Sequence, residues 1–366
     1  MSDRQVVFAQ VGLGFTINGL GACLVLLARD LATPAAGLAW LSSSFGAGLL
    51  AAGFAGRWVL RRHPQPVLRI AALVTAAGTA LLATAPVAAL AAAGAVLLGL
   101  GAAGVVLVTP ALLRGQDLAP RLARVNAAGS VAALLGPLTI GALDTAGVSG
   151  RLALLAAVVP LVLAAFGVRP GAPMTGADGA PPRRAAAAAW AAVVVAVAME
   201  FCFSIWATAR LQATGLTAGT AAAAAAAFLA GMAGGRLLAP RLLRRGVPVV
   251  PLSCGLVAAG TLIVALAGTP APVAAGLLAA GLGIGPLYPV TLARLVQVPG
   301  LTAARSAAYG ALASGTAILA APAGLAVLGT ALDLPAAFLI TVLPLAVLLL
   351  LLARARPGAS AATRAS

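Results

Sequence analysis

Long apolar runs alternate with short polar gaps along the whole chain. An α-helix needs about 20 apolar residues to cross the hydrocarbon core of a bilayer. Twelve runs of about this length are bounded by Arg, Pro or Gly: 6–28, 35–56, 67–85, 87–112, 125–146, 151–168, 186–207, 214–235, 247–268, 271–293, 304–328 and 335–353. The runs are continuous over about 20 residues and do not alternate over about 10, so they predict helices and not the strands of a membrane barrel.

The arginines predict how these helices are oriented. If the N-terminus is cytoplasmic, twenty of the 23 basic residues fall in cytoplasmic segments, and only Arg29, Arg151 and Arg210 fall on the other side. Cytoplasmic loops of membrane proteins carry an excess of Lys and Arg. We therefore expect an integral protein of a bacterial-type cytoplasmic (inner) membrane with both termini in the cytoplasm.

The longest polar break divides the chain into two sets of six predicted helices. Residues 169–185 are rich in Pro and Gly and predict a flexible cytoplasmic linker. The expected domains are an N-terminal six-helix bundle over 1–168 and a C-terminal bundle with a short basic tail over 186–366.

The two halves share small motifs at one offset. Gly56-Arg57 corresponds to Gly235-Arg236 at an offset of 179 residues, and the same offset joins Pro110 to Pro289, Gly104 to Gly283 and Gly136 to Gly315. An even number of helices per half makes the two repeats parallel. The predicted fold class is an all-α polytopic membrane protein of 12 transmembrane helices in two parallel six-helix repeats.

This organisation resembles the major facilitator superfamily, over nearly the whole chain. The stretch GFAGRWVLRR (53–62) is similar to the superfamily signature between its second and third helices, although it lacks the usual acidic residue, and GMAGGRLLAPRLLRR (231–245) is similar to the counterpart in the second half. The resemblance implies a cytoplasmic latch in which five arginines gate conformational change: Arg57, Arg61, Arg62, Arg236 and Arg241. The alternative is that these arginines only set the topology.

Two branches of the superfamily share local features with the chain. The second half resembles the fucose–proton symporter branch in MEFCFSIWATARL (199–211), in 214–236 and in GLGIGPLYPVTLA (281–293). A competing likeness is LLGPLTIGA (134–142), which is similar to the Gly-Pro motif of proton-coupled drug exporters. The predicted helix 87–112 lacks the intramembrane arginine that those exporters carry.

Composition excludes several other classes of protein. The chain is 62% hydrophobic and 8% charged, which does not suit a single core folded in water. Its net charge of +16 comes from arginines in short gaps, so we expect no nucleic acid partner. The chain has no lysine and hence no Walker A motif. Three separated cysteines and a single His63 predict no metal site and no cofactor, and an enzyme is not expected.

Glu200 is the only glutamate in the chain and lies inside the predicted helix 186–207. Because no water solvates a carboxylate at this depth, it must face a polar cavity, find a partner or bind a proton. Ala196, Phe203 and Ser204 share its helical face, a mixed surface that could line a cavity. We interpret Glu200 as the coupling-proton site or a hydrogen-bond acceptor for substrate. The alternative is a glutamate held structurally by a neighbouring helix.

Other polar and aromatic residues are candidates for the same site. Asn18 lies near the predicted midplane and could bind substrate hydroxyl groups or another helix. Asp30 lies beside Arg29 and is expected to form a surface ion pair or, alternatively, an outward-facing relay. The remaining candidates are a serine beside Glu200 and four aromatic residues that could stack on a ring: Ser204, Trp40, Trp206, Tyr288 and Tyr309.

These features together predict a secondary active transporter of a small organic solute. We expect it to work by alternating access, to couple transport to protons, and to act as a monomer in the lipid bilayer. The alternative is a proton-driven efflux pump for drugs or metabolites. A membrane receptor or scaffold that transports nothing is a third possibility.

The predicted topology can be tested by cysteine labelling. Single cysteines at Ala180 in the linker and Ala359 in the tail should react with an impermeant maleimide only after the cytoplasmic face is exposed. Labelling of the two positions from opposite faces of the membrane would contradict the arrangement of helices given above.

Overall fold

The computed structural model describes residues 2–32, 38, 40–59, 64–113, 118–166, 182–301 and 303–354. All regular elements within these ranges are helical. They are α1 (Ser2–Asp30), α2 (Trp40–Val59), α3 (Pro64–Thr84), α4 (Ala88–Leu112), α5 (Leu118–Thr145), the 3-10 helix η2 (Gly150–Leu154), α6 (Leu155–Ala165), α7 (Arg183–Gln212), α8 (Ala218–Arg244), α9 (Val249–Leu266), α10 (Pro270–Ile284), α11 (Leu287–Val296), α12 (Ala303–Ala331) and α13 (Leu334–Arg354).

The predicted spanning segments are present as helices. In the described ranges, 10 helical segments are long and apolar enough to cross a membrane, and two shorter apolar helices, Ser43–Ala55 and Gly150–Ala165, occupy the places of the other two predicted segments. Most of the predicted linker, residues 169–181, lies outside the described residues.

Several predicted elements have different bounds in the structure. Helix α8 runs to Arg244, nine residues past the predicted end at residue 235, so Arg236 and Arg241 lie within the helix and not in a cytoplasmic segment as predicted. Helix α5 begins at Leu118, because helical hydrogen bonding continues through the polar turn that precedes the apolar run predicted to start at residue 125. The predicted helix 271–293 is divided into α10 and α11, which meet at Gly285 and Pro286. A proline in this position removes a backbone donor and bends the helix.

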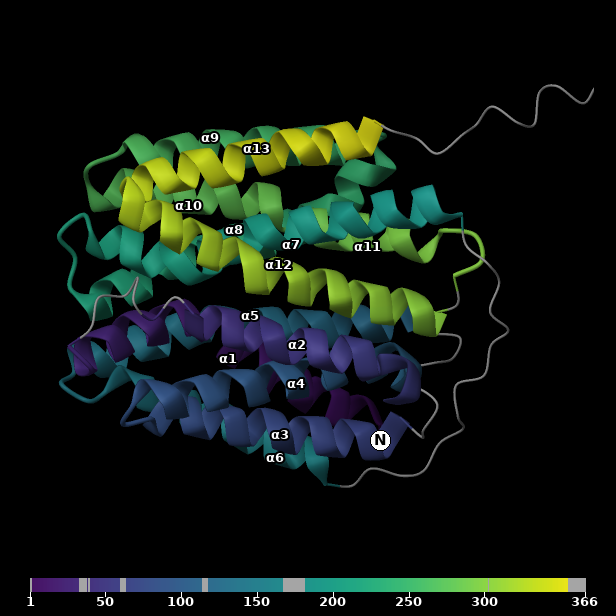
Figure 1. Cartoon of the computed structure of the whole chain (residues 1–366), viewed down its shortest axis with the longest axis horizontal. Coiled ribbons are helices and arrows are strands. Elements are labelled where there is room, and N and C mark those ends of the chain that lie inside the picture. The colour runs from purple at the N-terminus through teal and green to yellow at the C-terminus, as the bar shows by residue number, and fades with distance from the viewer. Residues whose placement is uncertain are drawn as a thin grey trace, which may run out of the picture.

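The helices form two layers with the same internal arrangement (Figure 1). Helices α1–α6 make the first half and α7–α13 the second. In the first half α1 packs on α5 and α6, and in the second half α7 packs on α12 and α13. Likewise α3 packs on α4 as α9 packs on α10. The halves meet where α2 lies along α12, α5 along α8, and α1 along α7.

Small residues let the two halves touch backbone to backbone. A Cβ atom on Gly21 of α1 would collide with the carbonyl oxygen atoms of Ser204 and Ile205 in α7. A Cβ atom on Gly46 of α2 would collide with the backbone of Leu319 in α12. Without a hydrophobic driving force between helices in lipid, close packing of this kind holds them together.

The two ends of the bundle differ in how tightly the halves close. We call the end where α1 and α7 begin the basic end, and the end where they finish, at Arg29, Asp30, Asp144 and Arg151, the ion-pair end. Every residue of α1 from Gly19 to Ala28 is buried, whereas Gln10, Ile17 and Asn18 are half-buried. Burial along α1 is therefore complete toward the ion-pair end and only partial toward the basic end.

The contact at Gly21 makes a stability prediction. Gly21→Ala should lower the melting temperature of the detergent-solubilised protein, because the new methyl group forces α1 away from α7. Gly255→Ala in α9 is the matched control, since no atom lies within 4 Å of its Cβ position. The control should be neutral or stabilising, as alanine favours a helix over glycine by roughly 1 kcal/mol. Equal melting temperatures for the two variants would contradict a close α1–α7 contact.

Candidate functional site

A carboxylate and a guanidinium meet inside the second half. The Glu200 Oε1 atom of α7 lies 3.6 Å from the Arg236 Nη2 atom of α8. The Glu200 side chain is 16% exposed and the Arg236 side chain 37% exposed. Between Val195 and Thr208 of α7, every residue is buried except Glu200 and Ser204. The two polar residues, one helical turn apart, therefore mark the accessible stripe of this helix.

Aromatic packing sets the rotation of α7 that turns Glu200 toward α8. The Phe203 ring lies with its centroid 5.4 Å from that of Phe228 in α8 and 5.1 Å from that of Phe338 in α13. On another face, Phe201 stacks on Phe45 of α2 with ring centroids 6.2 Å apart. These rings pack α7 against α2, α8 and α13, and Glu200 lies beside Arg236 of α8.

Two hydroxyl groups extend the charged pair. Tyr288, in the first turn of α11, lies within side-chain hydrogen-bonding reach of Ser314 in α12, and both Glu200 and Arg236 are close enough to act on it electrostatically. The bend at Gly285 and Pro286 brings Tyr288 there. We call Glu200, Arg236, Tyr288 and Ser314 the charged cluster.

Asn18 and Ser204 lie together in a second polar place, between the two halves. They line a small cavity of about 10 Å³, which is about the space of one water molecule. The cavity wall also includes Pro137 of α5 and Phe203 and Thr208 of α7. The Asn18 Nδ2 atom donates to the Gly14 carbonyl oxygen at 2.9 Å, within its own helix. Phe203 and Ser204 line this cavity, Glu200 is not among its described lining residues, and Ala196 is buried in the core.

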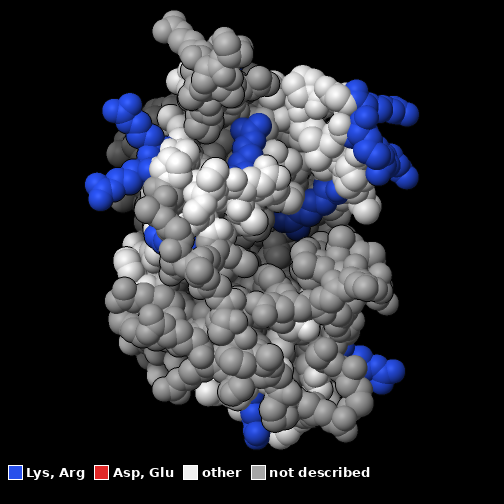
Figure 2. Space-filling view, turned by 90° about the vertical axis from the view of Figure 1, so that its right-hand side faces the viewer, with Lys and Arg blue, Asp and Glu red and all other residues white. Residues whose placement is uncertain are grey.

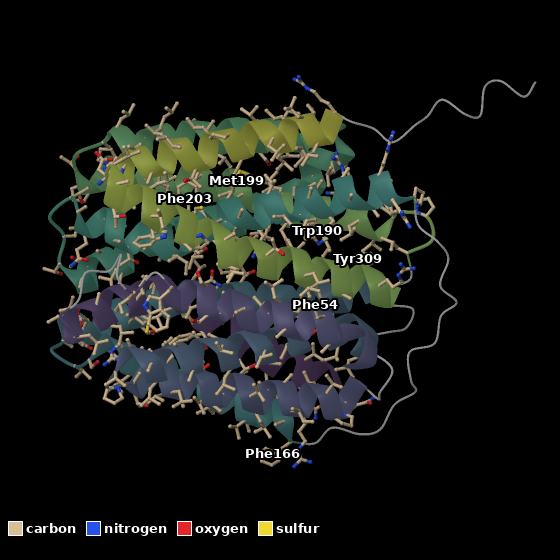
Figure 3. The ribbon with its side chains drawn as sticks, viewed as in Figure 1. Phe54, Phe166, Trp190, Met199, Phe203 and Tyr309 are labelled. Carbon is tan, nitrogen blue, oxygen red and sulfur yellow. The ribbon has the colours of Figure 1, made fainter. Side chains whose placement is uncertain are left out.

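Three aromatic candidates lie apart from the charged cluster. Trp206 is buried, and its indole N–H donates to the Pro322 carbonyl oxygen at 3.1 Å, so the hydrogen bond is internal to the second half. Trp40 is exposed at the start of α2, at the ion-pair end. Tyr309 is half-buried on α12 and lies nearer the basic end than Met199 and Phe203 do (Figure 3).

Asp30 belongs to a network of charges at the ion-pair end. The expected pair with Arg29 is present at 3.4 Å, and Asp30 also accepts from Arg151 Nε at 2.8 Å. Arg29 in turn donates to both carboxylate oxygens of Asp144, at 2.7 and 2.9 Å. The sequence predicts the pairing of Asp30 with Arg29 but not the contacts with Asp144 and Arg151.

Arginines also bind the final carbonyl groups of equivalent helices at this end. Arg151 Nη1 donates to the Ala85 carbonyl oxygen at 3.0 Å, after α3. Arg210 Nε donates to the Val264 carbonyl oxygen at 2.9 Å, in α9. Ala85 and Val264 are 179 residues apart, which is the offset of the predicted repeat. All three arginines placed on this side by the sequence therefore have partners.

The predicted gating arginines fall in different places. Arg236 pairs with Glu200, a contact that sequence reasoning did not anticipate. Arg241 is exposed in the last turn of α8. Arg57 belongs to α2, but its side chain lies outside the described residues, as do Arg61 and Arg62 entirely. Figure 2 looks onto the basic end and shows arginine side chains scattered over it, most of them on the second half, with no acidic side chain in view among the described residues.

Comparisons with known proteins support the fold. No family model matches the chain, and no curated protein matches it in sequence. The crystal structure of a point mutant of the nucleoside transporter NupG matches with a TM-score of 0.74 and 13% sequence identity, over 96% of this chain and 98% of that one. The chain has a major facilitator-like fold. This confirms the predicted class of polytopic, all-α membrane protein.

A double-mutant cycle tests whether Glu200 and Arg236 stabilise the protein by interacting with each other. Arg236→Ala should lower the melting temperature, because Glu200 then has no counter-charge. The expected cost is on the order of 1–2 kcal/mol, below that of a fully buried pair, since Arg236 is 37% exposed. Combining it with Glu200→Gln should restore most of the loss, as measured by thermal unfolding in detergent. Additive losses in the double variant would show that the two side chains do not interact.

Proposed function

We propose that the protein is a secondary active transporter of a small organic solute and that Glu200 binds the coupling proton. One observation carries this proposal: among the described residues, Glu200 is the acidic residue in the middle of a spanning helix, and it is partly accessible on an otherwise buried stretch of α7. An ionisable group held in a membrane for packing alone is costly, so its retention favours a role in proton or substrate movement.

Alternating access needs two arrangements of the halves with similar energies. The contacts between the halves at Gly21, Gly46 and the Phe45–Phe201 stack are uncharged, so separating them leaves no charge unpaired in lipid. The accessibility of α1 and α7 supports a cleft that is open at the basic end and closed at the ion-pair end. The excess of arginine at the basic end favours placing it in the cytoplasm, with the protein in an inner membrane.

The polar groups near the cleft bear on the class of solute. A sugar-like solute, as in the fucose–proton symporter branch, needs many hydrogen-bond partners. Around Asn18 and Ser204, six of the nine described residues that line the small cavity are apolar, and the Asn18 amide already donates within its own helix. This favours a solute with one strong polar group and an apolar body.

A transport assay tests the role of Glu200. A thermal-shift screen of sugars, organic acids and antibiotics on the purified protein would first select a solute. In proteoliposomes, a proton gradient should then drive flux of that solute, and Glu200→Gln should reduce the gradient-driven flux at least tenfold.

The matched control changes an acid to its amide outside the cluster. Asp333→Asn should transport normally, because Asp333 caps α13 by accepting from the Ala336 backbone N–H and asparagine caps helices equally well. If Glu200→Gln transports with the pH dependence of the parent protein, Glu200 does not bind the coupling proton.

A further inference from the structure

The two members of the charged pair respond differently to the loss of their partner. Glu200 can become neutral by binding a proton, because a carboxylic acid is stable in an apolar environment. Arg236 cannot become neutral, since a guanidinium keeps its proton in proteins. When Glu200 is protonated, Arg236 is therefore left as an uncompensated cation inside the membrane, and only an anion can replace the lost carboxylate.

The geometry of the cluster also favours a ligand on the arginine. Arg236 is the more exposed member of the pair, at 37% against 16% for Glu200. An incoming molecule therefore meets the guanidinium before the carboxylate. Tyr288 and Ser314 share a hydrogen bond, and this leaves one hydroxyl hydrogen of the two to donate to an oxyanion.

The neighbouring helices add no competing charge. Of the elements packed on α7, α8 brings Arg236 and α11 brings Tyr288 to Glu200, and Arg236 is the charged group that acts on it among the described residues. The other described acids, Asp3, Asp30, Asp144 and Asp333, lie at helix ends. A cationic solute would find a single carboxylate already engaged by an arginine.

We propose that the charged cluster binds an organic monoanion, of the carboxylate class, on Arg236 in place of the Glu200 carboxylate. This rests on the proposed function. A proton neutralises Glu200. The anion then pairs with Arg236 and accepts from one hydroxyl of the Tyr288–Ser314 pair, and one proton and one negative charge cross together. After release of both, the Glu200–Arg236 pair forms again. The cotransport of one proton and one monoanion therefore moves no net charge across the membrane.

Binding of charge-matched probes to the purified full-length protein tests the proposal. The probes are benzoate, lactate and nicotinate, their amides (benzamide, lactamide and nicotinamide), and benzylamine as the cationic counterpart. We expect a carboxylate to bind, its amide and the amine to bind at least tenfold more weakly, and the affinity to rise up to tenfold for each unit that the pH falls between 8 and 6. Calorimetry and thermal shifts measure both effects.

Two variants separate the roles of the pair. Glu200→Gln should bind the carboxylate tightly at pH 8, without pH dependence, because its Arg236 is permanently free. Glu200→Gln combined with Arg236→Gln keeps an uncharged pair, so it should fold yet lose carboxylate binding at least tenfold. The proposal is overturned if an amide or the amine binds as well as the acid, or if no carboxylate binds even to the Glu200→Gln variant.

The same experiments distinguish this proposal from the proposed function. A neutral or cationic solute whose proton-driven flux is lost in Glu200→Gln would overturn the anion site and leave the proton-coupled transporter in place. Carboxylate binding on Arg236 without any response of solute flux to a proton gradient would do the reverse. A membrane potential set by a potassium ionophore should not drive carboxylate uptake, because the proton and the anion cancel.

Discussion

A carboxylate and a guanidinium that must share one water-poor space constrain the rest of the second half. Neither charge is stable alone in hydrocarbon, so α7 and α8 have to hold Glu200 and Arg236 within reach of each other. The Phe203 aromatic cluster fixes the rotation of α7, and the bend between α10 and α11 delivers Tyr288 to the same place. The packing of these helices and the chemistry of the site therefore depend on the same contacts.

Buried hydroxyl groups show the same constraint on a smaller scale. Thr75, Thr79 and Thr261 each donate to the carbonyl oxygen four residues earlier in their own helix, at distances of 2.7, 2.8 and 2.7 Å. A polar group in an apolar surrounding is costly unless it is hydrogen-bonded. These residues therefore satisfy their hydroxyl groups within their own helices, and Asn18 does the same with its amide by donating to the Gly14 carbonyl oxygen.

Sequence reasoning predicted the helices well and their contacts poorly, for a physical reason. A spanning helix is a local property, since about 20 apolar residues and the bounding arginines are read from one stretch. The partner of Glu200 depends on the rotation of α7 and α8 about their own axes. Contacts of Phe203 with aromatic rings on α8 and α13 help to set this rotation, and the sequence of α7 alone does not reveal them. Arg29 and Asp144 are 115 residues apart, so the local sequence around either residue does not predict their contact.

The sequence of the predicted helix 271–293 contains the residues at which the structure divides it into α10 and α11. The letters GIGPLYP contain both the proline that breaks a helix and the tyrosine that the break positions. An apolar run of the right length hid this, because hydropathy measures the solvent around a helix and not its shape.

The charge network at the ion-pair end has a mechanical consequence. Arg29, Asp30, Asp144 and Arg151 all belong to the first half, and Arg210 holds carbonyl groups of its own half. These ion pairs and arginine–carbonyl hydrogen bonds therefore stiffen each half internally. The described contacts between the halves include glycine backbones and stacked aromatic rings. The two halves could therefore separate and close again at this interface without breaking any of these ion pairs.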